Sequence, residues 1–153
     1  MAMTTLILYA SLALGVSFLC SILEAVVLSI PHTYIAVLEK DGDKNGILWA
    51  NLKEDDAVKP LTAILTLNTI AHTMGAAGVG SEVQSIWGEG ALTVASIILT
   101  IAVLFLSEIV PKTLGTAYWK QLAPITGKVL NFLIKFLVLL IIPIQALKAI
   151  LPK

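Results

Sequence analysis

The sequence carries little charge and no arginine. Only 13% of its 153 residues are charged, whereas an ordinary soluble domain has about one quarter. All ten basic residues are lysines, and the formal net charge is zero, so no basic stripe predicts a nucleic-acid partner. With 58% hydrophobic residues and a mean hydropathy of +0.93, the composition excludes an ordinary soluble domain and predicts an integral membrane protein.

Cysteine is nearly absent, since Cys20 is the single one, and this excludes an internal disulfide. The apolar segment near Met1 lacks a basic leading region and is longer than the roughly 7 to 15 residues of a signal-peptide core. We therefore expect a retained membrane span there. No internal repeat is visible, and we expect residues 1–153 to form a single transmembrane domain.

Long apolar runs predict an all-α membrane protein with three spans. A helix needs about 20 apolar residues to cross a bilayer, and residues 6–30, 61–79 and 91–110 meet this length. Two amphipathic juxtamembrane helices are expected within 34–53, joined by a polar glycine turn. A fourth apolar stretch covers residues 129–147, within a further juxtamembrane helix expected at about 128–150.

Lysines interrupt this fourth stretch, at positions 128, 135 and 148. The first two lie on one helical face, which is typical of a helix lying in the membrane interface with its lysines reaching toward water. We favour this interfacial placement over a fourth span.

Lysine asymmetry predicts the orientation. The connection 31–60 holds four lysines and the connection 80–90 holds none, while more lysines follow the third span. The positive-inside rule then places the N-terminus outside and the C-terminus in the cytoplasm, with the chain in the plasma or inner membrane.

Glu24 and Glu108 lie within the first and third apolar runs. A carboxylate at that depth costs several kilocalories per mole unless it is paired, protonated or bound to a cation, so each marks a candidate functional site. Ser17 and Ser21 share a helical face with Glu24. The serines could instead bond to their own helix backbone or allow close helix packing.

The second span offers Asn68 and, one turn later, His72. Asn68 could supply a neutral oxygen ligand or a hydrogen bond between helices. His72 could be a satisfied core histidine or a further ion-site residue. The small residues 75–78 permit close backbone approach, either within one subunit or between two.

The third span ends in the segment 107–112, which contains Ser107, Glu108, Pro111 and Lys112. Proline has no N–H, so Pro111 should free the carbonyl of Ser107 and kink or end the helix. Freed carbonyls beside a carboxylate are a device by which membrane transporters bind ions. Alternatively, Pro111 only marks the exit from the bilayer, and Lys112 forms an ordinary helical ion pair with Glu108.

The predicted ligands of the ion are therefore oxygens, from Ser17, Ser21, Asn68 and Glu108, with Glu24, His72, Ser107, Pro111 and Lys112 as possible additional ion-site or gating residues. Such a set favours a hard cation, Mg²⁺ or Na⁺, over zinc or copper. The acidic loop at 41–46 resembles the first half of an EF-hand, but Leu52 stands where the bidentate Glu is required. We expect a glycine turn there.

The motifs also resemble a known family, the CorC and cyclin M (CNNM) magnesium transporters. They are, in order, Ser17-Phe-Leu-Cys-Ser21-Ile-Leu-Glu24, Leu67-Asn68-Thr69 and Glu108-Ile-Val-Pro111-Lys112-Thr113. The resemblance implies a dimeric membrane domain that exports Mg²⁺ in exchange for Na⁺, with nucleotide-binding CBS domains in a cytosolic part that this chain lacks. His72 and Leu23 depart from the pattern, since many members have asparagine and a small polar residue there.

Transport is one of two functions that the sequence leaves open. The alternative is a regulatory membrane anchor that senses Mg²⁺ without transporting it. We do not expect an enzyme, because no nucleophile and base are paired in the sequence.

Overall fold

The computed structural model describes residues 1–151, apart from the side chains of Gln145 and Lys148. The side chain of Lys148, one of the three lysines of the fourth stretch, and residues 152 and 153 of the expected domain therefore lie outside the described part. All regular elements in this part are helices. They are α1 (Ala2–Ser29), α2 (His32–Lys40), α3 (Lys44–Leu52), α4 (Glu54–Trp87), η1 (Glu89–Ala91), α5 (Leu92–Ala102), η2 (Val103–Ile109), α6 (Val110–Ala117), α7 (Trp119–Phe136) and α8 (Val138–Ile150).

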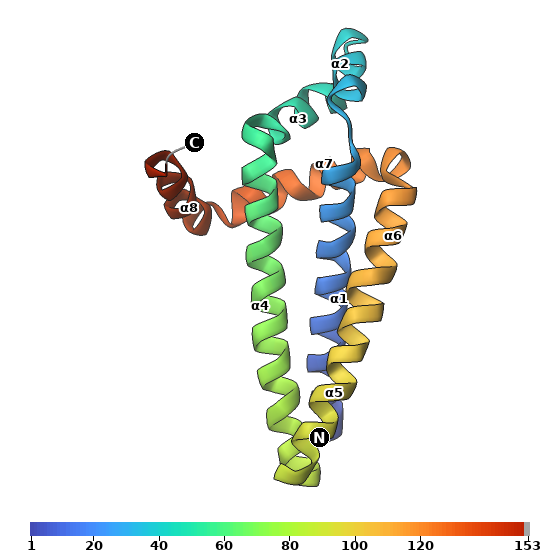
Figure 1. The fold of residues 1–153 in the computed structure, drawn as a ribbon, viewed down its shortest axis with the longest axis vertical. Helices are drawn as coiled ribbons and strands as arrows, with labels where there is room; N and C mark the ends of the chain where they lie inside the picture. The colour runs from blue at the N-terminus through green and yellow to red at the C-terminus, as the bar shows by residue number, and fades with distance from the viewer. Residues whose placement is uncertain (152–153) are drawn as a thin grey trace.

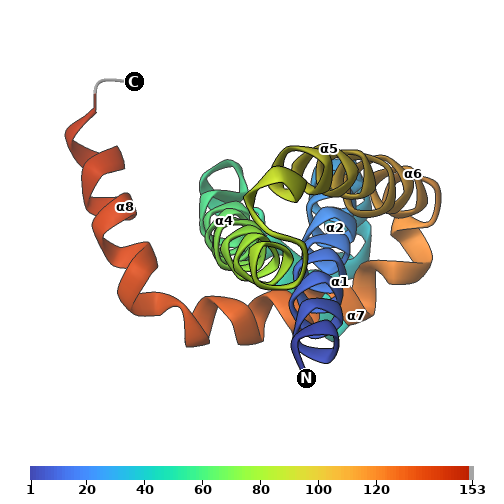
Figure 2. The same cartoon turned by 90° about the horizontal axis from the view of Figure 1, so that it is seen from below.

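Three long rods run side by side: α1, α4 and the continuous helix from η1 through α6 (Figure 1). The view along the rods shows them clustered, with α7 and α8 reaching away to one side (Figure 2). By length and composition, α1 and the helix Glu89–Ala117 could cross a membrane, each with a mean hydropathy of 2.3. The predicted first and third spans therefore correspond to real helices.

The second predicted span, 61–79, lies inside α4, which packs along α1. This helix is long enough to cross a membrane but is not among those apolar enough, because polar residues such as Asn68 and His72 interrupt it. Its first turn is irregular, since Asp55, Asp56 and Ala57 have φ between 52° and 60°.

The third span continues past its predicted end at Val110, through Pro111, to Ala117. Directly before α6 the backbone widens into a π-helical segment, η2, and for this reason the helix can continue through Pro111. Pro111 then falls in the first turn of α6, where a missing N–H costs little. The expectation that Pro111 could end the helix is therefore wrong.

The C-terminal helices lie across and away from the bundle (Figure 1). α7 begins at Trp119, earlier than the predicted 128, and is bent from α8 by 81° at Leu137. If the pair forms one broken span, it would be a third membrane crossing by composition. The buried indole of Trp49 donates to the Ala123 carbonyl at 2.9 Å, which joins α7 to α3.

Between α2 and α3 the chain makes the expected glycine turn. Gly42 has φ +73°, and the Asp43 carboxylate accepts a hydrogen bond from the Asn45 N–H at 2.9 Å, which caps α3. Lys53 then donates to the Val27 carbonyl at 2.8 Å, near the end of α1. Burial lowers the pKa of Lys53 below its ordinary value, and the charge of Asp56 acts in the opposite direction.

The small residues of α4 pack within this chain. A Cβ added at Gly75 would collide with the Cβ of Ala13, and one at Gly78 would lie 2.6 Å from the ring of Tyr9. Both partners belong to α1. Close packing at these two glycines therefore takes place inside one subunit.

Candidate ion site

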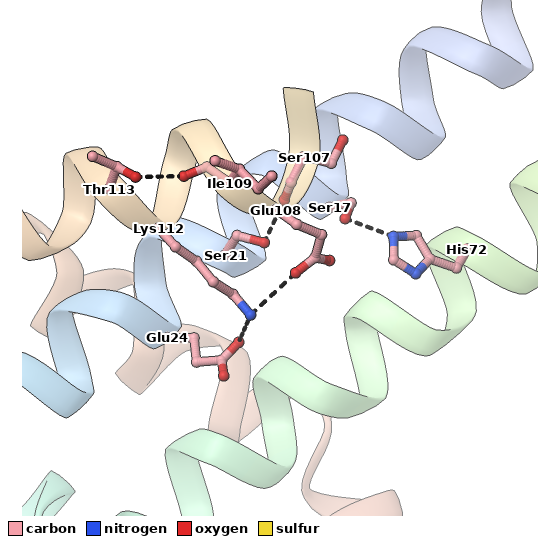
Figure 3. A network of polar contacts seen from close by, with 9 residues as sticks. All are labelled: Ser17, Ser21, Glu24, His72, Ser107, Glu108, Ile109, Lys112 and Thr113. Carbon is pink, nitrogen blue, oxygen red and sulfur yellow. Dashed lines mark hydrogen bonds and ion pairs between the residues drawn. The ribbon is translucent and has the colours of Figure 1, made fainter. Parts of the chain in front are cut away.

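The site begins where α1 meets the π-helical segment. Ser17 and Ser21 are fully buried, and the Ser21 hydroxyl donates to the Ser107 carbonyl at 2.5 Å (Figure 3). That carbonyl would bond to the N–H of residue 111 in a regular helix, but Pro111 has none. The prediction that Pro111 frees this oxygen is confirmed, since the oxygen accepts a hydrogen bond from Ser21 on α1.

Ser107 also contributes its own side chain, which donates to the Leu14 carbonyl at 3.0 Å. The residue is fully buried, so two hydrogen bonds join η2 to α1 in the interior. The sequence predicted a freed backbone carbonyl at Ser107, because Pro111 lacks the N–H that would bond to it. It gave no sign of the bond from the Ser107 hydroxyl, because that bond depends on how the two helices are packed.

His72 lies opposite Ser17, with its Nε2 2.6 Å from the serine oxygen. The histidine therefore has a hydrogen-bond partner, as the interpretation of a satisfied core histidine predicted. The bond also joins α4 to α1 beside the serine pair (Figure 3).

The three charged residues of the site form one cluster. The Lys112 Nζ lies 3.1 Å from a carboxylate oxygen of Glu108 and 3.5 Å from one of Glu24 (Figure 3). The pair with Glu108 was among the sequence alternatives. The contact with Glu24 joins α6 to α1 and was missed, because residue spacing within one helix says nothing about a neighbouring helix.

Asn68 lies one turn before His72 on α4, and its side-chain oxygen is buried. Among the described residues, this oxygen has no hydrogen-bond donor. Leaving a buried acceptor unsatisfied costs about 1 to 3 kcal/mol, so such an atom calls for an explanation. A bound cation would satisfy it.

A cavity of about 330 Å³ opens between α4 and the third helix, and Glu108 and His72 line it. Its other walls are largely apolar and include Ala13, Ala76 and Leu104. A space of this size can hold a hydrated ion. The cavity therefore gives an ion room beside one carboxylate and beside the histidine that bonds to Ser17.

The donor atoms that the structure gathers are mostly oxygens. In the part of the chain described, no group of three or more His, Cys, Asp or Glu side chains could hold a metal by itself. An ion bound here would be held by neutral serine, amide or carbonyl oxygens together with one or two carboxylates. That composition suits a hard cation and is unlike a zinc site.

Comparison with known proteins identifies the family. The profile described as "Cyclin M transmembrane N-terminal domain" matches residues 8–152. The chain belongs to this family. One relative of this cyclin M domain is "UPF0053 protein sll1254" from a Synechocystis strain, which is 27% identical over 117 residues. Another is "DUF21 domain-containing protein At1g55930, chloroplastic" from Arabidopsis thaliana, which is 26% identical over 118 residues.

The aligned regions cover 76% and 77% of this chain but only 34% and 18% of the two relatives. The cyclin M domain thus corresponds to a minor part of each longer protein.

Proposed function

We propose that this cyclin M domain exports Mg²⁺ from the cytosol and that Na⁺ entry drives the export. The observation that carries the proposal is the buried, unpartnered oxygen of Asn68. A neutral amide oxygen is a ligand that Mg²⁺ accepts, and an ion would remove the cost of leaving this atom unsatisfied.

The hydroxyl oxygen of Ser21 is a second candidate ligand for the ion. Its hydroxyl proton is already donated to the Ser107 carbonyl, so its lone pairs remain for a cation. Ser17 offers a second hydroxyl oxygen, and Glu108 supplies negative charge from the cavity wall. Mg²⁺ loses its water reluctantly, so direct binding needs several well-placed oxygens, and one or two carboxylates among them suit this ion.

The site would be reached from the cytosol. Glu24 lies in the C-terminal half of α1, and Lys112 lies in the C-terminal half of the continuous helix Glu89–Ala117. These halves are the ones nearer to α2, α3 and α7 (Figure 1). The connection that contains α2 and α3 holds four lysines. By the positive-inside rule, this end of the bundle would lie on the cytoplasmic side of a plasma or inner membrane. We also propose a homodimer, and a native mass corresponding to one chain in mild detergent would contradict that part.

Flux measurement tests the function. The purified chain in liposomes should carry Mg²⁺ down its gradient, as reported by a trapped Mg²⁺ indicator, and an opposing Na⁺ gradient should accelerate the flux. Asn68→Ala should lose most of this flux, whereas Asn51→Ala, an exposed position on α3, should keep it. Binding of Mg²⁺ without flux would favour the alternative of a Mg²⁺-sensing membrane anchor.

A further inference from the structure

Lys112 holds a positive charge between carboxylates of two helices. Its ammonium lies 3.1 Å from Glu108, on the same helix, and 3.5 Å from Glu24 on α1. The lysine side chain is 43% exposed, so open space lies beside it. A lysine head is a compact charge on a flexible four-carbon stem and can leave its partners without movement of the backbone.

We propose that Lys112 is a tethered counter-ion, which occupies the two carboxylates when Mg²⁺ is absent and is displaced when Mg²⁺ binds. The inference rests on the proposed function, because it concerns the same ion site. It adds a residue that controls when the carboxylates are available and which ion they favour.

Charge balance supports the displacement. Glu24, Glu108 and Lys112 together carry a formal charge of −1. A divalent ion added beside the ammonium would leave +1 in a partly desolvated site, whereas a divalent ion that displaces the ammonium leaves a neutral cluster. A monovalent ion gives a neutral cluster with the ammonium still in place. The position of Lys112 thus sets whether the site favours a divalent or a monovalent cation.

An ordinary ion pair between exposed side chains makes a different prediction. Such pairs contribute little, so loss of Lys112 would leave ion binding unchanged. A tethered counter-ion competes with Mg²⁺ for the same oxygens, so its loss should tighten Mg²⁺ binding and should weaken the ability of Na⁺ to compete.

Calorimetric Mg²⁺ titration of the purified chain separates these cases. Lys112→Met keeps the length of the side chain without its charge and should bind Mg²⁺ about tenfold more tightly than the parent. Lys112→Arg, which keeps the charge, should not tighten binding. Lys128→Met, an exposed lysine on α7, is the matched control and should bind like the parent.

The outcomes distinguish this inference from the proposed function. A parent that binds no Mg²⁺ overturns both. A parent that binds Mg²⁺, together with a Lys112→Met variant of equal or weaker affinity, overturns only the tethered counter-ion.

A measurement on the parent alone does not depend on whether a variant folds. If Mg²⁺ displaces the ammonium, the rate at which an amine-reactive reagent modifies Lys112, read by peptide mass spectrometry, should rise at saturating Mg²⁺. The rate at Lys128 should not change. An unchanged rate at Lys112 in protein that binds Mg²⁺ overturns the displacement.

Discussion

Glu108 is the residue whose charge should matter most to ion binding, because it alone lines the cavity and also pairs with Lys112. Glu108→Gln keeps the size of the side chain but removes the charge. Coulomb attraction scales with the product of charges, so Mg²⁺ affinity should fall by about tenfold or more and Na⁺ affinity by less. Protection against thermal unfolding by each ion measures both effects.

The matched control is Glu89→Gln. The Glu89 carboxylate accepts a hydrogen bond from Gln84 on an exposed surface near the far end of α4. Its loss should leave Mg²⁺ protection unchanged. Equal protection of the parent and Glu108→Gln would refute Glu108 as a ligand.

Asn68 and Ser21 should respond differently to removal of their oxygens. Asn68→Ala deletes an acceptor that has no donor within the described part of the chain. The ion-free protein should therefore unfold at the same or a slightly higher temperature, while its Mg²⁺ protection falls. Ser21→Ala also loses the bond to Ser107, which should cost about 1 kcal/mol of stability. If both variants bind Mg²⁺ like the parent, the ion site lies elsewhere.

At the scale of helices, the contact between α1 and α4 depends on the absence of a side chain at Gly75. Gly75→Ala would place a methyl group against the Cβ of Ala13 and force the helices apart, at a cost of about 1 to 3 kcal/mol. Gly15→Ala is the same change on α1, where no atom of another described helix lies within 4 Å of the new carbon. Thermal unfolding should show a lower midpoint for the first variant and no loss for the second.

The sequence allowed the apolar helices and the freed carbonyl of Ser107 to be predicted, because both follow from local chemistry. Run length predicts a helix, and a missing N–H at Pro111 predicts an unpaired acceptor. The sequence could not reveal the π-helical widening that lets the third helix continue to Ala117. Widening of this kind depends on how η2 packs against α1.

The same limit applies to the site. Spacing placed Ser17, Ser21 and Glu24 on one face of α1, as the structure has them. It could not reveal that Lys112 bridges from α6 to Glu24, or that His72 reaches Ser17 from α4. Both are contacts between helices far apart in sequence. The sequence also did not predict the start of α7 at Trp119, because Lys120 and Pro124 interrupt the apolar run at its beginning.

At the scale of the whole molecule, the proposed orientation is tested by labelling. In a Cys20→Ala background, Asp43→Cys in the turn before α3 should not react with an impermeant thiol reagent in intact cells. Gln84→Cys, near the opposite end of α4, should react. The two positions should lie on opposite sides of the membrane, because α4 runs the length of the bundle. The reversed pattern would refute the orientation and the cytosolic entry to the site.

The depth of the site has an electrical consequence. Ser17 lies twelve residues before the end of α1, about 18 Å at 1.5 Å per residue, and about 6 Å of this is the headgroup layer. Glu108 lies nine residues before the end of α6, at a shallower depth. In the proposed orientation, with the ends of these helices at the membrane surface, an ion that enters from the cytosol would therefore cross about one third of the membrane voltage before it binds.

For a divalent cation, that fraction corresponds to about 1.5 kcal/mol per 100 mV. A voltage that is negative inside opposes the movement of a cation out of the cytosol into the site. The Mg²⁺ concentration for half-maximal efflux should therefore rise about tenfold between 0 and −100 mV. Efflux from vesicles held at set potassium diffusion potentials measures this shift. A half-maximal concentration that does not change with voltage would place the site electrically at the membrane surface. A site at the proposed depth would instead need the highest cytosolic Mg²⁺ concentration for half-maximal efflux at the resting voltage of the cell, which is negative inside.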